Sequence, residues 1–345
     1  MKVHFPGRIL DRHVGGNTTY TRKIAEGLAA RGIDIASLPF SARPAGTMLL
    51  ESIAPLRIPR QGNVIHYSAD TGPLVRLGRT PSVVTVHGVA SRWISTARNR
   101  WQEKIWRTRV SRAIECTGRV ITVSESSADD VSAVFGLPRD RIAVIPHGID
   151  VEKYAAPQMI SSEVRRRLPS QYLLYVGNIE PRKNLGPLLE AVEAPEFKRL
   201  GLPLVIAGKP AWNYDDLMAR IGSATNVIYL GFVSEEDKIA LMQNAHLFVF
   251  PSLYEGFGFP VLEAMAGGTP VLTSQRGSLK EVGGPSLKLL GEVLDRECIL
   301  RGLLDSLGDS SRLQASADQG REWASHFSWD ASIDAHIRIY EELLR

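Results

Sequence analysis

Short apolar runs alternate with helix-like segments along nearly the whole chain, and this alternation limits the possible folds more than any other feature. The runs are rich in Val and Ile and almost continuously apolar, as expected for parallel strands covered on both faces. The intervening segments repeat apolar residues with a helical period, which is the pattern of consecutive β–α units. The predicted strands are residues 3–5, 33–38, 64–67, 83–87, 120–123 and 143–146 in the first half, and 172–176, 204–207, 227–230, 247–250 and 270–273 in the second.

A polar stretch at residues 150–170 interrupts this alternation with two prolines and a cluster of charges, and is typical of a linker. A chain of 345 residues is also long for one core. We therefore predict two α/β domains, residues 1–155 and 165–327, each with a doubly wound parallel sheet. Ligands of such sheets bind at the carboxyl ends of the strands, so we expect the domains to face a central cleft.

The last segment, residues 328–345, has the pattern of an amphipathic helix with Ser328 or Asp330 as its N-cap. Two placements are open, on the second domain or crossing back onto the first. We predict that it crosses back.

Composition excludes several classes of protein. The chain is 44% hydrophobic and 23% charged, which is normal for a globular protein. A net charge of +4 suits an anionic small ligand or a membrane surface, and it is poor support for a nucleic-acid partner. Cys116 and Cys298 lack metal-type spacing and predict a reduced, cytoplasmic protein. The amino-terminal residues lack the apolar core of a signal peptide, and no apolar run is long enough to span a bilayer.

Two loops of the first half follow predicted strands and carry chemically useful residues. Gly15 and Gly16, in "GGNTTY", precede a helix, so backbone N–H groups there suit a phosphate, although a plain turn explains them equally well. His87 ends the strand in "VVTVHG" and is a candidate to bind a sugar hydroxyl or a phosphate, with a purely structural histidine as the alternative.

A third loop, "YVGNIEPRKN", leaves its strand at Gly177 and presents Arg182 and Lys183. Two adjacent cations at a strand-to-helix junction suit a diphosphate, because their hydrogen bonds to it are charge-assisted. Pro181 stiffens the turn and favours a fixed pair over two solvated cations.

The fourth loop holds two acids, Glu255 and Glu263, with seven residues between them in "PSLYEGFGFPVLEAMAGG". Glycines open the backbone just before a helix that starts near Pro260, so helix N–H groups are available to an anion. Carboxylates would repel a phosphate. We therefore predict that they bind sugar or ribose hydroxyls on either side of it.

Together with "TVHG", "RIAVIPHGID" and the final "FSWD", these motifs resemble the retaining glycosyltransferases of family GT4 over nearly the whole chain. The forms "GNIEPRKN" and "SLYEGFGFPVLEAMAGG" are most similar to bacterial mannosyl- and rhamnosyltransferases of polysaccharide assembly. The resemblance implies a GT-B fold of two Rossmann-like domains. It also implies a nucleotide-diphospho-sugar donor on the second domain and an acceptor on the first.

The resemblance also assigns roles to individual positions. Glu255 and His87 would contact the transferred sugar, Glu263 the ribose diol, and Arg182 and Lys183 the diphosphate. The remaining donor-binding positions would contribute mainly backbone atoms: Gly15, Gly16, Gly177, Phe257, Gly258 and Phe259.

Two positions depart from the family pattern. Many relatives place an arginine where this chain has Asn178, so the cationic role rests on Arg182 and Lys183. Lys280 replaces a proline of the commoner "SLPEV" form.

The sequence therefore predicts a retaining transferase that moves a hexose, with a lean to GDP-mannose, onto a glycan, lipid-linked or small-molecule acceptor without a metal or other cofactor. The alternatives are a GT-B epimerase or phosphorylase and a non-catalytic sugar-nucleotide binding protein. Residues 91–112 carry seven Arg or Lys, and Trp93, Ala97, Trp101 and Ile105 recur every fourth position. This predicts a basic amphipathic helix whose stripe packs on the first domain or lies at the inner face of the membrane.

Overall fold

The computed structural model describes residues 1–11, 15–94, 100–289 and 291–345, which form two compact units. Unit 1 comprises Met1–Gly148 and Phe327–Arg345, and unit 2 comprises Ile149–His326. Residues 149–155, which the sequence-based prediction gave to the first domain, belong to unit 2 because α6 (Val151–Ala155) packs on α12 (Phe259–Ala266). The predicted linker contains α6 and a second short helix, α7 (Ser162–Arg165).

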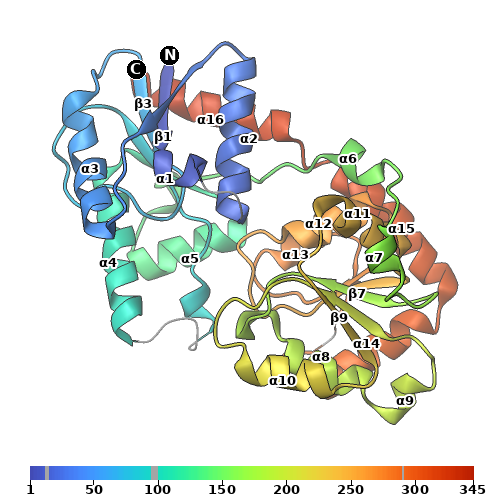
Figure 1. Cartoon of the computed structure of the whole chain (residues 1–345). Helices are drawn as coiled ribbons and strands as arrows, with labels where there is room; N and C mark the ends of the chain where they lie inside the picture. Colours follow the sequence, from blue (N-terminus) through green and yellow to red (C-terminus); the bar gives the residue numbers. More distant parts are fainter. Residues whose placement is uncertain (12–14, 95–99, 290) are drawn as a thin grey trace. The chain divides into compact units, whose positions relative to one another are not determined.

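Unit 1 is built on a six-stranded parallel sheet in the order β2-β1-β3-β4-β5-β6 (Figure 1). The order reverses direction between β1 and β3, as in a doubly wound fold. Its strands are β1 (Lys2–Pro6), β2 (Asp34–Leu38), β3 (Asn63–Tyr67), β4 (Ser82–Thr85), β5 (Arg119–Thr122) and β6 (Ile142–Val144). Its helices are α1 (Gly7–Leu10), α2 (Gly16–Ala30), α3 (Pro44–Arg57), η1 (Ala90–Arg92), α4 (Arg100–Cys116), α5 (Glu125–Phe135), η2 (Arg139–Arg141) and α16 (Trp329–Leu344).

Helices cover both faces of this sheet, which explains why its strands are almost continuously apolar. In β4, Val83 packs with residues of α2 and α16, whereas the next residue, Val84, packs with residues of α3, α4 and α5. Successive side chains of a strand point to opposite faces, so each face has its own core.

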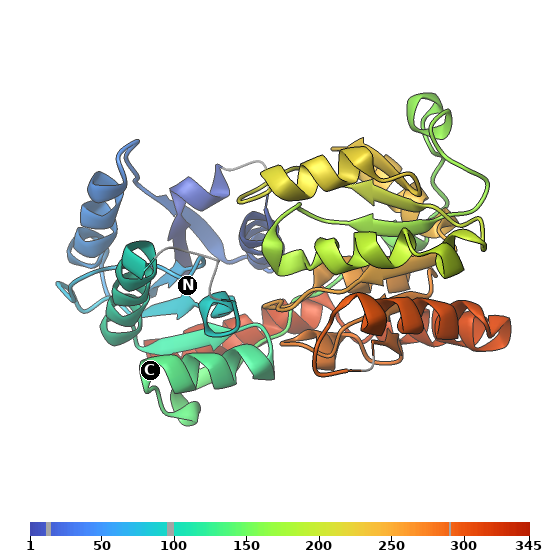
Figure 2. The same ribbon diagram turned by 90° about the horizontal axis from the view of Figure 1, so that it is seen from below.

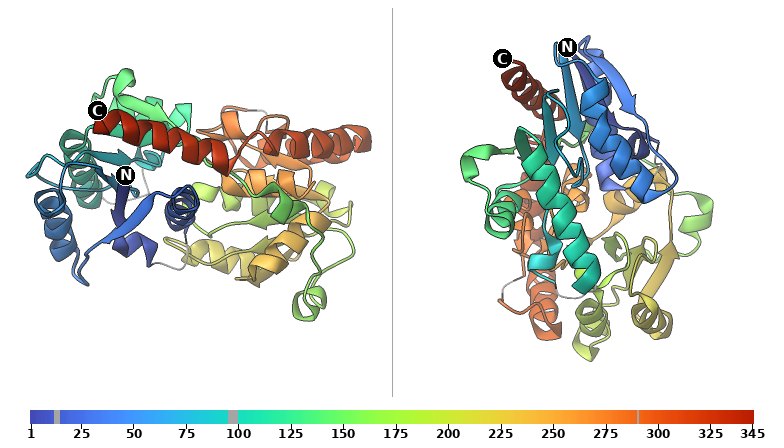
Figure 3. Two further views of the ribbon diagram at one scale, coloured as in Figure 1. Left: turned by 90° about the horizontal axis from the view of Figure 1, so that it is seen from above. Right: turned by 90° about the vertical axis from the view of Figure 1, so that its left-hand side faces the viewer.

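The last helix, α16, belongs to unit 1 (Figure 3, in red). The Ser328 side chain accepts a hydrogen bond from the Ala331 backbone N–H at 3.3 Å and caps its first turn. Ile333 and Tyr340 are buried against α2 and the sheet. A Cβ atom on Gly27 would lie 2.0 Å from Cδ1 of Ile333, so only glycine at this point of α2 allows the observed approach of the two helices.

Unit 2 has a second parallel sheet in the order β12-β11-β10-β7-β8-β9, with α8, α10 and α14 on one face and α11, α12 and α15 on the other (Figure 1). Figure 2 shows α10 in yellow beside α8 in yellow-green. The strands are β7 (Leu173–Val176), β8 (Leu204–Ala207), β9 (Val227–Gly231), β10 (Leu247–Phe250), β11 (Val271–Thr273) and β12 (Leu287–Lys288). The helices besides α6, α7 and α12 are η3 (Pro181–Lys183), α8 (Leu185–Val192), α9 (Pro195–Lys198), α10 (Asp215–Ser223), α11 (Glu235–Asn244), α13 (Leu279–Val282), α14 (Arg296–Leu307) and α15 (Ser310–Ala324).

The basic helix differs from its prediction. Residues 91 and 92 lie in η1, residues 95–99, including Ala97 of the predicted stripe, lie outside the described residues, and α4 begins at Arg100. Trp93 therefore does not belong to α4, and its indole N–H donates to the buried carboxylate of Asp130 at 2.9 Å. Trp101 and Ile105 are 75% and 60% exposed, so this part of the stripe does not pack on unit 1. Among the helices that the structure describes, none has the length and apolar composition needed to cross a bilayer.

Candidate active site

The sheet of unit 2 reverses its winding direction between β7 and β10, which pair with each other at its centre. The loops that leave the carboxyl ends of two such strands turn to opposite faces of the sheet, and ligands of doubly wound folds bind at this point. The loop after β7 carries Arg182 and Lys183, and the loop after β10 carries Glu255. The Leu253 backbone N–H donates to the Arg182 carbonyl oxygen at 2.9 Å and holds the two loops together.

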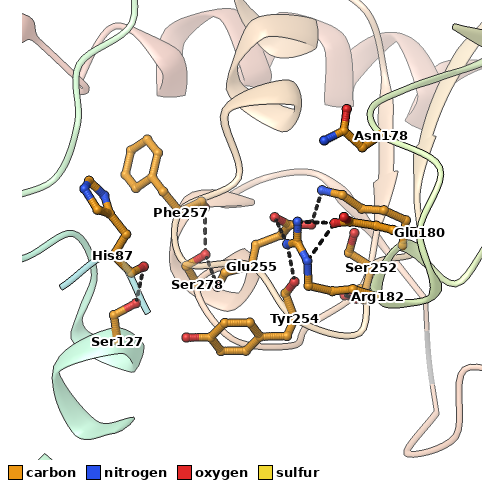
Figure 4. A network of polar contacts seen from close by, with 12 residues as sticks. His87, Ser127, Asn178, Glu180, Arg182, Ser252, Tyr254, Glu255, Phe257 and Ser278 are labelled. Carbon is orange, nitrogen blue, oxygen red and sulfur yellow. Dashed lines mark hydrogen bonds and ion pairs between the residues drawn. The ribbon is translucent and has the colours of Figure 1, made fainter. Parts of the chain in front are cut away.

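These loops form a compact network of charged side chains (Figure 4). The Nζ atom of Lys183 lies 2.6 Å from Oε1 of Glu255, and Nη1 of Arg182 lies 2.6 Å from Oε2 of the same carboxylate. On its other side, Arg182 donates from Nε and Nη2 to Oε1 of Glu180, at 3.0 and 2.5 Å. Arg182 Nη1 also donates to the carbonyl oxygen of Tyr254 at 3.0 Å. Two carboxylates and two cations thus balance in a region that is largely shielded from solvent.

The network keeps Glu255 ionised. Burial is the largest single effect on this carboxyl and favours its neutral form, but Arg182 and Lys183 together outweigh burial and lower the pKa of Glu255 to about 2. Burial lowers the pKa of the Lys183 ammonium, and the nearby Glu255 offsets only part of that effect. Burial also opposes the charge of Arg182, yet Glu255 and Glu180 raise its pKa above the ordinary value. Glu255 is therefore a hydrogen-bond acceptor, not a proton donor.

The backbone between Glu255 and α12 takes a shape that requires glycine. Gly258 has φ +104°, and a Cβ atom there would lie 2.8 Å from Cδ2 of Leu279. The hydroxyl oxygen of Ser278 lies 2.9 Å from the Glu255 carbonyl oxygen and 2.7 Å from that of Phe257, so it can donate to either. The loop thus reaches α12 in a fixed path, directly before the N–H groups of the first helical turn.

Glu263 lies on α12 in a second polar cluster of unit 2. Its Oε1 atom lies 2.7 Å from the Tyr154 hydroxyl oxygen and accepts from Lys238 Nζ at 3.1 Å. The Tyr154 hydroxyl also lies 3.1 Å from Oε1 of Glu235, so its single hydrogen can go to either acid, and burial and the two acids raise the pKa of Tyr154 far above the ordinary value. The other oxygen of Glu263, Oε2, has no hydrogen-bond partner among the described residues, so it can accept from a ligand.

In unit 1, His87 lies two residues after the end of β4 and is fixed by backbone and side-chain contacts. Its Nε2 lies 2.9 Å from the carbonyl oxygen of Ser68, and its backbone N–H donates to Oδ1 of Asp70 at 2.8 Å. A carbonyl only accepts, so Nε2 carries the hydrogen and Nδ1 is the acceptor of the neutral ring. Ser127 donates to the His87 carbonyl oxygen at 3.4 Å (Figure 4). The ring packs edge-on against Tyr20, with 5.0 Å between centroids.

Gly15 and Gly16 also lie in unit 1, at the start of α2. Gly15 has φ +122°, which disfavours other residues, and its carbonyl oxygen accepts from the N–H groups of Thr18 and Thr19 at 3.0 and 3.1 Å. A Cβ atom on Gly15 or Gly16 would meet no atom of the described residues within 4 Å.

Within unit 2 the structure therefore brings Arg182, Lys183 and Glu255 into direct contact and places Glu263 in a separate cluster. Gly177 directly follows β7, and the rings of Phe257 and Phe259 contact each other at 5.2 Å between centroids. The sequence-based prediction missed the residues that hold these side chains: Asp70, Tyr154, Glu180, Lys238 and Ser278. Glu180 stands inside the "GNIEPRKN" motif and was visible there, but Tyr154 fell in the predicted linker and Lys238 on an ordinary surface pattern.

No cluster of three or more His, Cys, Asp or Glu side chains arranged to hold a metal ion occurs in residues 1–11, 15–94, 100–289 and 291–345. The charges beside Glu255 are supplied by Arg182 and Lys183.

Comparison with known proteins identifies both halves of the chain. A model described as glycosyl transferases group 1 matches residues 160–323, and one described as glycosyltransferase family 4 matches residues 63–153. The first covers the network around Glu255, and the second covers His87.

Two curated relatives are mannosyltransferases by name. O-antigen chain mannosyltransferase B of Escherichia coli is 33% identical over 253 residues, which are 71% of this chain and 65% of that protein. MMP α-(1→4)-mannosyltransferase of Mycolicibacterium hassiacum is 32% identical over 280 residues, 76% of this chain and 66% of that protein. The chain thus spans slightly less than two thirds of each relative.

A solved structure of Anabaena HepE in complex with UDP-glucose shares the fold, with a TM-score of 0.73, 17% identity and coverage of 99% of both chains. The family models, the relatives and the two doubly wound sheets agree. The chain belongs to the family 4 glycosyltransferases, with the two Rossmann-like domains of the GT-B fold.

Proposed function

We propose that this chain transfers a hexose from a nucleotide-diphospho-sugar to a glycan, lipid-linked or small-molecule acceptor, with retention of configuration. The observation that carries the proposal is the buried contact of Lys183 and Arg182 with an ionised Glu255 at the strand-switch point of unit 2. Two relatives named mannosyltransferases favour mannose, so GDP-mannose is the first donor to test. The complex of HepE with UDP-glucose supports a nucleotide sugar as the donor class.

We assign different parts of the donor to different groups of the site. Lys183 and the N-terminal N–H groups of α12 stabilise the negative charge that develops on the leaving diphosphate, a contribution for which each donor is typically worth about 10²–10³ in rate. Glu255 stays ionised and accepts hydrogen bonds from hydroxyls of the transferred sugar. Oε2 of Glu263 accepts from the ribose diol.

Residues of unit 1 have proposed roles as well. His87, with Nδ1 as its acceptor, binds a hydroxyl of the transferred sugar. The backbone at Gly15 and Gly16, where a Cβ atom would meet no described atom within 4 Å, approaches the diphosphate. These two roles rest on the family pattern together with the local geometry of each residue.

We further propose that the reaction needs no metal ion, because protein cations supply the charge that a metal would otherwise provide. Turnover should persist when EDTA is added to the assay. Strict dependence on added Mg²⁺ would show that a metal is part of the reaction.

The exposed part of α4 suits an anionic lipid surface where a lipid-linked acceptor would be found. Trp101 and Ile105 are exposed, and Lys104 Nζ lies 5.9 Å from the Trp101 ring centroid, so apolar and basic groups stand side by side. We expect co-sedimentation with vesicles rich in phosphatidylglycerol but not with phosphatidylcholine alone, and a loss of it in Trp101→Ala. Leu49→Ala, at an exposed apolar residue of α3, is the control. Equal binding of both vesicle types would remove this part of the proposal.

The direct test of the function is a calorimetric panel of GDP, UDP, dTDP and ADP, followed by incubation with the sugar conjugate of the nucleotide that binds. Release of the nucleoside diphosphate with transfer to an acceptor or to water supports the proposal. Binding without release would indicate a sugar-nucleotide binding protein. Conversion of the sugar into its epimer, with or without release of the nucleotide, would indicate an epimerase. A requirement for inorganic phosphate would indicate a phosphorylase.

A further inference from the structure

We propose that Arg182 is a positioning residue for Glu255, that Glu180 holds Arg182 in this place, and that the diphosphate of the donor is bound by Lys183 without Arg182. This inference rests on the proposed function, because it divides the work of that same site. It differs from the sequence-based expectation, in which Arg182 and Lys183 share the diphosphate.

The hydrogen bonds of Arg182 leave it little capacity for a ligand. A guanidinium has five N–H donors. Two, from Nε and Nη2, go to Glu180, and both donors of Nη1 are used by Glu255 and the Tyr254 carbonyl. Although 22% of the side chain is exposed, a single Nη2 hydrogen is left within the part of the chain that the structure describes. A diphosphate would have to break this arrangement to gain a bidentate contact.

Lys183, unlike Arg182, has most of its N–H donors available for a ligand. An ammonium has three N–H donors. One goes to Glu255, and the Nζ atom also lies 4.8 Å from the ring centroid of Phe250. The other two donors have no hydrogen-bond partner in the described ranges, so Lys183 can bind a phosphate oxygen and keep its contact with Glu255.

Glu180 explains why Arg182 stays where it is. Glu180 is 4% exposed. Among the described residues, its side chain forms hydrogen bonds only with Nε and Nη2 of Arg182. Its side chain and that of Glu255 hold the planar guanidinium from two sides, as the two carboxylates of a clamp. Without Glu180, Arg182 would keep only its contacts with Glu255 and the Tyr254 carbonyl oxygen, and its Nε and Nη2 donors would be available to an anionic ligand.

The contacts with Arg182 and Lys183 fix the orientation of the Glu255 carboxylate. Arg182 binds Oε2 and Lys183 binds Oε1, so the plane of the carboxylate is fixed by two different nitrogen atoms. An arginine orients its partner through a rigid fork, whereas a lysine is a point charge on a flexible chain. Loss of the fork should therefore disturb the alignment of Glu255 with the sugar and leave the binding of the bare diphosphate largely intact.

The test compares Glu180→Gln, Arg182→Lys, Arg182→Ala and Lys183→Ala in the whole protein, with the nucleotide that the wild type binds. We expect Arg182→Lys and Arg182→Ala to lower kcat about 10-fold or more while the Kd of the bare nucleoside diphosphate changes less than about 3-fold. Lys183→Ala should raise that Kd at least about 10-fold. Glu180→Gln should lower kcat in the same direction as Arg182→Lys without weakening diphosphate binding.

A double-mutant cycle tests whether Glu180 acts through Arg182. In the Arg182→Ala background, Glu180→Gln should cause no further loss of kcat, because there is no guanidinium left to hold. The control cycle uses Glu190→Gln and Arg220→Ala, an exposed ion pair of the same unit, and should leave kcat unchanged. Thermal unfolding of each variant confirms that it is folded, and Arg182→Lys replaces Arg182→Ala in the cycle should the alanine variant fail to fold.

Three results would overturn the proposal. In a wild type that binds and turns over a nucleotide sugar, a loss of diphosphate affinity in Arg182→Ala as large as in Lys183→Ala would make Arg182 a diphosphate ligand. Additive effects of Glu180→Gln and Arg182→Ala on kcat would show that Glu180 does not act through Arg182. A wild type that neither binds nucleoside diphosphates nor releases them from nucleotide sugars would overturn the proposed function and this inference together.

Discussion

The Oε1 atom of Glu255 lies 2.6 Å from Nζ of Lys183, so the acid and the cation that were expected to serve different parts of one donor are already in contact. The pair lies in a buried network whose charges balance without a ligand. Removing the charge of Glu255 therefore changes two properties at once, the acceptor for sugar hydroxyls and the electrostatic balance around the diphosphate.

Glu255→Gln should separate catalysis from nucleotide binding. We expect kcat to fall by about 10²-fold, because an amide of the same size is a weaker acceptor and lacks the charge. The affinity for bare nucleoside diphosphate should stay equal or rise, since the network gains one net positive charge. Paired measurements of kcat and of Kd by calorimetry decide the point. Near-normal turnover would remove the proposed role of Glu255.

Tyr154→Phe should weaken nucleotide binding through Glu263. The hydroxyl of Tyr154 orients Oε1 of Glu263, and its loss removes a hydrogen bond worth about 1 kcal/mol and leaves the carboxylate less well fixed. We expect a Kd about 3- to 10-fold higher for the nucleoside diphosphate. Tyr172→Phe is the matched control, because its buried hydroxyl donates to the Leu241 carbonyl and should affect stability alone. Similar changes of Kd in both variants would argue against a special role of Tyr154.

Gly258→Ala should destabilise unit 2 and lower turnover. The residue has φ +104°, and a new Cβ atom would meet Leu279 at 2.8 Å, so the loop before α12 must shift. We expect a loss of about 1–3 kcal/mol in the free energy of unfolding. Gly222→Ala in α10, where a Cβ atom would meet nothing within 4 Å, should be neutral or stabilising by up to about 1 kcal/mol. Chemical denaturation of the two variants makes the comparison, and equal stabilities would contradict the strain at Gly258.

The stability of unit 1 should fall as the pH is lowered through the ordinary range of histidine. Burial lowers the pKa of His336 to about 4, and it lowers the pKa values of His66 and His147 well below their usual range. Between pH 6.5 and 4 the unfolded chain therefore binds more protons at these residues than the folded chain, so unfolding becomes more favourable as the pH falls. His336 alone contributes a loss of about 2 kcal/mol by pH 5.

Thermal unfolding measured from pH 7.5 to 5 checks this expectation. The other ionisable groups near His336 and His66 are His87 and the hydroxyls of Tyr20 and Tyr340. The two hydroxyls stay protonated over the whole range because burial raises the pKa of both. The ring of His147 packs against Tyr20 and Trp329, and that of His87 packs against His147. His336→Gln should flatten part of the dependence. A wild-type melting temperature that is constant from pH 7.5 to 5 would show that the histidines are not buried in their neutral form.

The fold could be predicted from the sequence because strands that are buried on both faces are almost continuously apolar. Val83 and Val84 are buried in two different cores, so consecutive residues of the strand are apolar, and this run can be recognised in the sequence alone. By contrast β12, Leu287–Lys288, has only two residues and no such pattern, and it was missed.

Part of the site was equally visible. Arg182, Lys183 and Glu255 are polar residues that directly follow apolar strands, and parallel strands bring such positions to one edge of the sheet. The division of roles was not visible, because it depends on which atom bonds to which. Nothing in the order of residues shows that Arg182 uses four of its N–H groups within the protein, or that Tyr154 reaches Glu263 across 109 positions.

The return of α16 to unit 1 also determines the order in which the two halves can form during synthesis. His336 forms a hydrogen bond with Tyr20, and Tyr340 forms one with His66, across 316 and 274 positions of the chain. Unit 2, Ile149–His326, is encoded entirely within this interval. Synthesis therefore completes every residue of unit 2 before the last helix of unit 1 has emerged.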